Sequence, residues 1–128
     1  MAKYPEQKLE KDWIQSPITT EVIEWTESFA EALVKVDLTT SQIRRFFGEV
    51  KRIAANFKNN KSDIVMLKPM LAYAAARKKN QTKILYEELT EALNAIREDD
   101  KFQENDFKNF VQIFESIVAY HKYHGGKE

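Results

Sequence analysis

The sequence contains no cysteine, and glycine and proline occur only three times each in 128 residues. Without cysteine the chain has no disulfide, no thiolate zinc ligand and no cysteine nucleophile. So few glycines and prolines leave too little turn chemistry for a β-sandwich or a β-barrel. No apolar run approaches the ~20 residues of a membrane-spanning helix, and the first residues lack the apolar segment of a secretory signal. We therefore expect a cytoplasmic globular protein with no membrane partner.

Apolar residues recur at steps of three and four along most of the chain, which is the period of an amphipathic helix. The pattern predicts five helices: one over about 19–36, one following Thr39 or Thr40, one opening at Ser62 or Asp63, one over about 82–98 and one over about 104–122. No segment alternates long enough to form a strand. We predict an all-α fold, a compact five-helix bundle-like single domain over 1–128. It has an irregular or partly ordered polar arm (1–18) and a helical core (19–124).

Two of these helices leave a question open. Pro69 has no backbone N–H, so it must either kink the third helix or begin its regular part. The apolar stripe of the fifth helix is broad, because Ile113 and Tyr120 widen it. That helix is therefore expected either at the centre of the core or shared with a second copy of the chain.

The formal net charge of zero hides a strong segregation of charge along the chain. Residues 1–37 hold four Lys and eight acidic residues, a net charge of −4. Residues 38–83 hold eleven Lys and Arg against two acidic residues, a net charge of +9, and residues 84–128 hold five against ten, a net charge of −5. The middle of the chain is thus a basic segment between acidic flanks.

Cations line one side of the predicted second helix. Arg44, Lys51 and Lys58 recur every seven residues, and Arg45 and Arg52 form a second line beside them. At 3.6 residues per turn these five residues form one basic strip next to the apolar seam. The third helix adds further cations: Lys68, Arg77, Lys78 and Lys79, with Lys83 just beyond. An antiparallel pairing of the two helices would place all of these cations along one groove.

The basic strip suits a nucleic-acid backbone, because each Lys or Arg that neutralises a phosphate releases counterions and adds affinity independent of base sequence. An acidic protein partner fits the same charges. Intramolecular ion pairs, worth about 0–1 kcal/mol each at a surface, are a third interpretation. Their partners would be the acidic residues of the first and fourth helices: Glu21, Glu24, Glu27, Glu31, Glu87, Glu88 and Glu91. The charge pattern leaves these three interpretations open.

Residue patterns typical of catalysis are missing: no Gly-rich phosphate loop, no H-E-x-x-H and no clustered acid pair in a basic pocket. His121 and His124 have the spacing of a helical metal pair. However, His121 falls on the apolar seam, which predicts a packed histidine, and His124 precedes Gly125 and Gly126, which predicts a helix C-terminus. The acidic segment 98–106 lacks the glycine of an EF-hand and predicts a solvated turn. We predict no enzymatic activity, no metal site and no cofactor.

Three stretches resemble one protein family, and they cover roughly residues 38 to 123. They are Gln42-Ile43-Arg44-Arg45-Phe46-Phe47, "LKPMLAYAAAR" from Leu67 to Arg77, and "FKNFVQIFESIVAYHK" from Phe107 to Lys122. In order and separation they resemble the small subunit of the type III-A CRISPR effector, the Csm complex. The middle stretch is the most specific of the three.

The resemblance implies a small, all-helical subunit of a ribonucleoprotein complex in antiviral defence, without a nuclease site of its own. Copies would stack head to tail in a filament beside the other effector subunits, and together they would hold the guide RNA and its paired target RNA. Carried over by position and by the basic strip, the residues expected to face RNA are Arg44, Arg45, Lys51, Arg52, Lys68, Arg77 and Lys78. The alternative from another class is a helical adaptor whose basic surface docks an acidic protein, with no role in RNA binding.

Overall fold

The computed structural model describes residues 8–36, 38–77 and 79–126, apart from the side chains of residues 40, 42, 43, 77 and 79–82. The helices are α1 (Lys11–Gln15), α2 (Thr20–Lys35), α3 (Thr40–Ala55), α4 (Phe57–Asn60), α5 (Leu67–Arg77), α6 (Lys79–Asn94) and α7 (Gln103–Tyr123), with a 3₁₀ helix η1 (Lys61–Met66) before α5. No strand occurs in the described ranges, which confirms the predicted all-α class. None of the described helices combines the length and the apolarity needed to cross a membrane.

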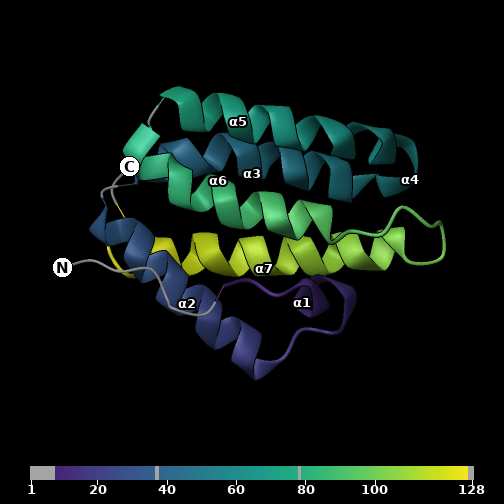
Figure 1. Cartoon of the computed structure of the whole chain (residues 1–128), viewed down its shortest axis with the longest axis horizontal. Coiled ribbons are helices and arrows are strands. Elements are labelled where there is room, and N and C mark those ends of the chain that lie inside the picture. Colours follow the sequence, from purple (N-terminus) through teal and green to yellow (C-terminus); the bar gives the residue numbers. More distant parts are fainter. Residues whose placement is uncertain (1–7, 37, 78, 127–128) are drawn as a thin grey trace.

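The last helix, α7, lies at the centre of the core. It runs across the middle of the molecule, with α1 and α2 on one side and α3, α5 and α6 on the other (Figure 1). It contacts α1, α2 and α3 directly, while α5 packs on α3 and α6. A helix with neighbours on several sides needs an apolar surface wider than a single stripe. This position accounts for the breadth of the apolar stripe in the fifth predicted helix.

Aromatic rings from three helices form a column along α7. Phe107, Phe110 and Phe114 are fully buried on successive turns, with adjacent ring centroids 5.9 and 6.2 Å apart. Phe57 packs on Phe107 at one end at 5.7 Å, and Phe46 packs on Phe114 at the other at 5.4 Å. Tilted contacts of this kind add about 0.5–1.5 kcal/mol each beyond the area they bury. The column fixes how α3 and α4 sit against α7.

The predicted N-terminal arm contributes to the core over its described part. Leu9, Trp13 and Ile14 are buried, the last two on the short helix α1, and the Trp13 ring meets Trp25 of α2 edge-on at 5.3 Å. The backbone of this segment is held as well, because Asn109 Nδ2 donates to the Ile14 carbonyl at 2.9 Å. The sequence predicts an irregular or partly ordered arm; in the structure its described part includes the short helix α1, which packs on α7.

Pro69 begins the regular part of its helix rather than kinking it. The chain from Lys61 to Met66 forms the 3₁₀ helix η1, and α5 starts at Leu67, so Pro69 stands in its first turn. N–H groups of the first turn have no intrahelical acceptor, and a proline there removes no hydrogen bond. The predicted start at Ser62 or Asp63 therefore corresponds to η1, and the α-helix follows four to five residues later.

The fourth predicted helix lies three to four residues further along the sequence than the observed helix α6. Beyond Asn94 the backbone leaves the helix, and the Arg97 N–H donates to Asp106 Oδ2 at 2.9 Å instead of to a carbonyl one turn back. Asp106 belongs to the first turn of α7 and is 1% exposed. A contact across nine residues thus ends α6, and helical periodicity carries no sign of it. The acidic segment after Arg97 forms the predicted turn between helices, in which Asp99 accepts the Lys101 N–H at 2.8 Å.

The C-terminal end of α7 is closed by a Schellman motif. The Gly125 N–H donates to the Lys122 carbonyl and the Gly126 N–H to the His121 carbonyl, at 3.2 and 2.8 Å. Gly125 has a φ of 92°, a left-handed value that suits glycine. At Gly126 an added Cβ would collide with the buried His121 ring, so any other residue there would have to displace the ring. The predicted helix end at His124 is confirmed, with His124 in the C-cap position.

Candidate nucleic-acid interface

Helix α3 presents the basic strip on its outer side. Phe46 and Val50 of this helix are buried in the core, whereas Arg44, Arg45 and Arg52 are exposed. This is the division that the amphipathic pattern predicts. Lys58 does not continue the line, because α3 ends at Ala55 and Lys58 belongs to the separate short helix α4. On α3 the strip therefore consists of Arg44, Arg45, Lys51 and Arg52.

Lys51 lies on the side of the strip that faces α7. Its Nζ is 2.9 Å from Glu115 Oε2, and both side chains are about half exposed, at 50% and 53%. The ammonium also lies 5.6 Å from the centre of the Phe47 ring. An exposed pair of this kind is worth about 0–1 kcal/mol. Lys51 is thus held in place but remains accessible from solvent.

Arg52 lies on the opposite side of the strip, towards η1. Its Nε donates to Glu49 Oε1 at 3.0 Å, and its Nη2 donates to Asp63 Oδ2 at 2.8 Å. The hydrogen bond to Glu49 and, to a smaller extent, the one to Asp63 raise the pKa of the Arg52 guanidinium. Because the only two acidic residues of segment 38–83 both face Arg52, much of its charge is matched within the chain.

Arg45 and Lys68 are the most available cations among those predicted RNA-facing residues whose side chains the structure describes. Both side chains are exposed, and no ion pair or hydrogen bond joins either head group to another residue in the described ranges. Arg44 is exposed too, but it has an interaction partner. An unpaired surface cation can bind a phosphate without first giving up another contact.

Helices α3 and α5 lie side by side and are joined by the reversal through α4 and η1, as the predicted antiparallel pairing requires (Figure 1). This arrangement places Lys68, at the start of α5, near the Arg52 end of α3. Arg77 closes α5, but its side chain lies outside the described residues, as does Lys78 entirely. Tyr73 is 67% exposed on α5, so its ring faces solvent rather than the core.

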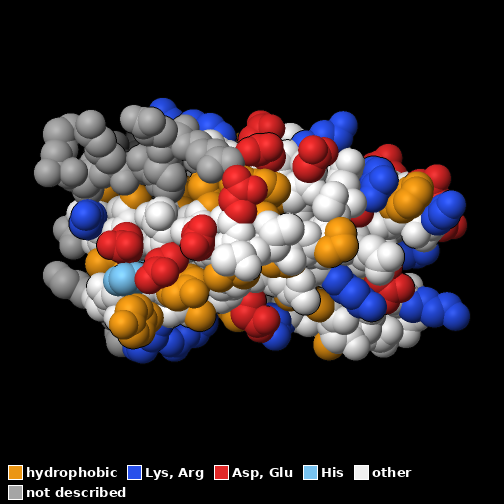
Figure 2. Space-filling model, turned by 90° about the horizontal axis from the view of Figure 1, so that it is seen from below, with side chains coloured by type: hydrophobic (Ala, Val, Ile, Leu, Met, Phe, Trp, Pro, Cys, Tyr) orange, Lys and Arg blue, Asp and Glu red, His pale blue; other side chains and the backbone are white. Residues whose placement is uncertain are grey.

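The intramolecular ion pairs differ from those expected from the sequence. Lys51 and Arg52 pair with Glu115, Glu49 and Asp63, and not with glutamates of α2 or α6. Figure 2 shows acidic side chains over the middle of a different face, with Lys and Arg mostly at its edges. The acidic surface of the protein is therefore not neutralised by Lys51 or Arg52.

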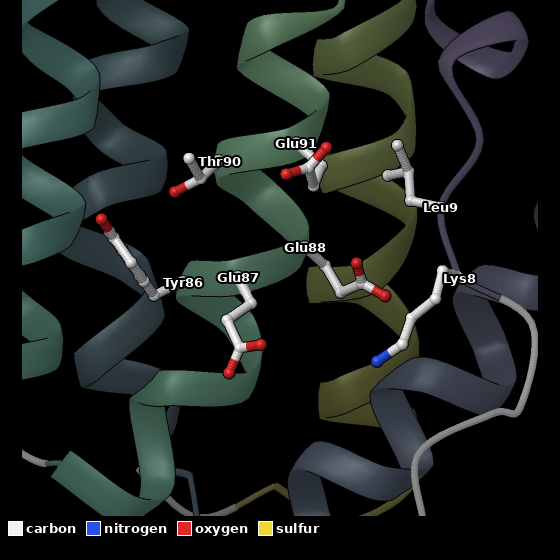
Figure 3. A pocket seen from close by; sticks show the side chains of 7 residues that line it. All are labelled: Lys8, Leu9, Tyr86, Glu87, Glu88, Thr90 and Glu91. Atoms are coloured by element: carbon white, nitrogen blue, oxygen red, sulfur yellow. The ribbon is translucent and has the colours of Figure 1, made fainter.

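A cavity of about 450 Å³ lies away from the basic strip, between α6 and the segment before α1 (Figure 3). Its lining consists of Lys8, Leu9, Tyr86, Glu87, Glu88, Thr90 and Glu91. Glu88 is 3% exposed, and burial raises its pKa although Lys8 and the Leu9 N–H favour the charged form. Three glutamates and one lysine line the cavity, so we do not expect it to bind a phosphate.

The two histidines have unrelated surroundings. His121 is buried in the core, and its Nε2 lies 2.7 Å from the Leu38 carbonyl oxygen, so the ring donates its Nε2–H there. Burial lowers the pKa of His121 and keeps the ring neutral. The prediction of a packed histidine is confirmed. His124 instead meets Glu27, with Nε2 and Oε2 2.8 Å apart. Sequence spacing could not reveal this contact, because Glu27 is 97 residues away.

A comparison with known protein families gives the same family as the three stretches of the sequence that resemble it. The model of the family described as Csm2 Type III-A matches residues 17–127. No curated protein and no solved structure gave a significant match. The family match covers the whole basic segment 38–83 and extends into both acidic flanks. The chain therefore belongs to the Csm2 Type III-A family and is a small subunit of the type III-A CRISPR effector complex.

Proposed function

We propose that this small subunit has no catalytic role and binds the phosphate backbone of the guide RNA and of its paired target RNA. The basic strip of α3 and Lys68 of α5 supply the contacts, and the resemblance adds Arg77 and Lys78. Backbone contacts suit this task because every guide differs in sequence, so the protein must hold RNA without reading its bases. The cytoplasm is the compartment in which we place the complex.

Arg45 and Lys68 are exposed, and neither head group has a partner among the residues that the structure describes; this observation supports the proposal most strongly. Lys51 and Arg52 can also bind a phosphate, but each must first give up its ion pair with a carboxylate. Exposed ion pairs of this kind contribute little to stability, so the exchange costs little. A phosphate would then take the place of a carboxylate at the same cations. Arg45 and Lys68 are expected to dominate the affinity, with Lys51 and Arg52 as secondary contacts.

Self-association in a stacked filament completes the proposal. Segment 38–83 carries +9, and its flanks carry −4 and −5. In head-to-tail stacking, an acidic end of one copy would face a basic end of the next, and the stacked copies would add their weak RNA contacts together. Reversing the charges at that contact is expected to shorten or abolish the filament.

The test is fluorescence anisotropy with the full-length, tag-free chain and a long single-stranded RNA over a series of salt concentrations. The variant Arg45→Glu/Lys68→Glu is compared with wild type. The matched control Lys11→Glu/Lys101→Glu makes the same change in net charge at exposed lysines outside α3 and α5. We expect the plot of log K against log salt to lose about 1.4 units of slope in the first variant, because each contact on a single strand contributes ~0.7.

Equal slopes in the two variants would reject the assignment of Arg45 and Lys68 and favour the adaptor alternative. Because a single copy shares the RNA with its neighbours, the same variants are also incorporated into the reconstituted effector complex. Retention of guide and target RNA is then measured against salt. Unchanged retention by the Arg45→Glu/Lys68→Glu complex would refute the proposed interface.

A further inference from the structure

Two glutamates of α2 and one histidine at the end of α7 converge at the surface. Glu27 and Glu31 are four residues apart, so both carboxylates project from the same face of α2. His124 Nε2 lies 2.8 Å from Glu27 Oε2 and 3.9 Å from Glu31 Oε1. One potential ligand atom from each residue lies within 4.8 Å of the other two. Figure 2 shows acidic side chains gathered beside a histidine on this face.

We propose that Glu27, Glu31 and His124 form a binding site for one divalent transition-metal ion, with Zn²⁺ as the ion that fits best. Zinc binds imidazole nitrogen and carboxylate oxygen at about 2.0–2.2 Å, so two ligands of a tetrahedral zinc stand about 3.4 Å apart. The observed separations of 2.8 and 3.9 Å lie on either side of that value. Small side-chain rotations are enough to bring the three ligands to one ion.

The backbone holds the histidine in position for this role. His124 is the C-cap of α7, and the two hydrogen bonds made by Gly125 and Gly126 fix the backbone directly behind it. The Tyr123 ring packs edge-on against the imidazole, with centroids 4.9 Å apart. The His124 side chain is 24% exposed, so its ring is constrained but an ion can reach it from solvent. A ligand that is already ordered loses little freedom when the metal binds.

The imidazole decides which class of ion the site takes. Mg²⁺ and Ca²⁺ prefer oxygen ligands alone, whereas a nitrogen and two carboxylates suit a first-row transition metal. Without metal, the contact to the Glu27 carboxylate requires the proton on Nε2. Zinc binding places the lone pair of Nε2 on the metal, and the ring proton moves to Nδ1. Three protein ligands leave the fourth position to water.

A metal here would join the middle of α2 to the end of α7. These helices already pack on each other, so the ion stabilises an existing contact rather than creating one. A metal that binds only the folded state raises the free energy of unfolding with the logarithm of the ratio of free metal concentration to Kd, and the melting temperature rises with it. The site is distinct from the basic strip of α3, and its test does not depend on RNA binding.

The experiment is a calorimetric titration of the tag-free, chelator-treated protein with Zn²⁺, with Mg²⁺ as the comparison ion. Three variants are compared: His124→Gln, Glu31→Gln and the control Glu24→Gln, an exposed glutamate of α2 outside the cluster. We expect one zinc per chain, no response to Mg²⁺, and a zinc affinity at least about tenfold lower in His124→Gln and Glu31→Gln but not in Glu24→Gln. Zinc should also raise the melting temperature of wild type by several degrees.

Glu31→Gln keeps the proposal testable if His124→Gln disturbs the fold, because the Glu31 carboxylate lies 3.9 Å from the ring and makes no short contact with it. If both Glu31→Gln and His124→Gln bind zinc as tightly as wild type, the zinc is bound elsewhere and the proposal is wrong. Absence of any zinc-dependent heat or melting shift in the wild type would overturn it as well.

Discussion

Replacing Asp106 with asparagine tests how α6, α7 and the turn between them are held together. The carboxylate is 1% exposed and accepts three hydrogen bonds from Arg97: from N and Nε to Oδ2, and from Nη2 to Oδ1, each 2.9 Å long. The Arg97 guanidinium also stacks on Phe102, with Cζ 3.9 Å from the ring centre. One acidic side chain thus fixes both the end of α6 and the start of α7.

The expected loss follows from what asparagine can and cannot do in this place. Its carbonyl oxygen can still accept from Arg97, but its amide group would point donor hydrogens at the donors of the guanidinium. A hydrogen bond to a charged group contributes about 1.5–3 kcal/mol, and a buried group left unpaired costs a similar amount. We therefore expect Asp106→Asn to lower the free energy of unfolding by roughly 3 kcal/mol at pH 7.

The loss should depend on pH in a defined direction. Burial alone would raise the pKa of Asp106, but the hydrogen bonds from the Arg97 side chain and backbone outweigh it, so the pKa lies below its usual value of 3.8. The folded protein then binds protons less readily than the unfolded chain at this group. Its stabilising contribution is complete above about pH 4 and disappears as the pH falls through the lower folded-state pKa.

Urea unfolding followed by circular dichroism, repeated from pH 7 down to pH 2, measures both effects. The control is Glu104→Gln in the same turn of α7, whose carboxylate is 55% exposed and 3.7 Å from Lys108 Nζ, and it should change stability by less than about 0.5 kcal/mol. The difference between wild type and Asp106→Asn should shrink towards pH 2. A difference that is small at pH 7, or that persists unchanged in acid, would refute the reasoning.

The close approach of Gly126 to the His121 ring predicts that Gly126→Ala lowers stability by about 2 kcal/mol or more, because the ring must leave its position. Gly48→Ala should instead raise stability by about 0.5–1 kcal/mol, because an added Cβ there meets nothing within 4 Å. Thermal melts of both variants measure this contrast. Equal melting temperatures would contradict it. Trp13→Ala should cost about 3–5 kcal/mol in urea unfolding, because Trp13 is 7% exposed against Trp25. A cost below about 1 kcal/mol would mean that the N-terminal segment is dispensable for the core.

The long helices could be predicted from sequence because each buries one face continuously. Along α7 the residues predicted to face the core, such as Phe107, Phe110 and Phe114, are fully buried. Helix α1 could not be predicted in the same way, since five residues are too short to show a period of 3.6. Its order comes from packing on other helices: Trp13 meets Trp25 of α2, and Asn109 of α7, 95 residues along the chain, donates to the Ile14 carbonyl.

The sequence predicts which cations of the candidate site are exposed, but it does not predict which carboxylates pair with them. Arg45 and Arg52 share a side of α3, and the pattern placed both in solvent. It could not distinguish them, although Arg52 meets two carboxylates while Arg45 meets none among the described residues. The partner of Lys51 is Glu115, 64 residues away, and only the packing of α3 on α7 brings them together. Tertiary contacts of this kind decide which surface cations are available.

The central position of α7 has a consequence for how the protein is made. Residues leave the ribosome in order, at about 5–20 per second, so α2 and α3 emerge before the helix that covers their apolar faces. Nothing before Gln103 can substitute for the Phe107–Phe114 column, and the core closes only after this last helix has been synthesised. A chain interrupted upstream would expose its apolar surface to chaperones and proteases. Cellular quality control would then remove incomplete subunits before they compete for a place in the effector complex.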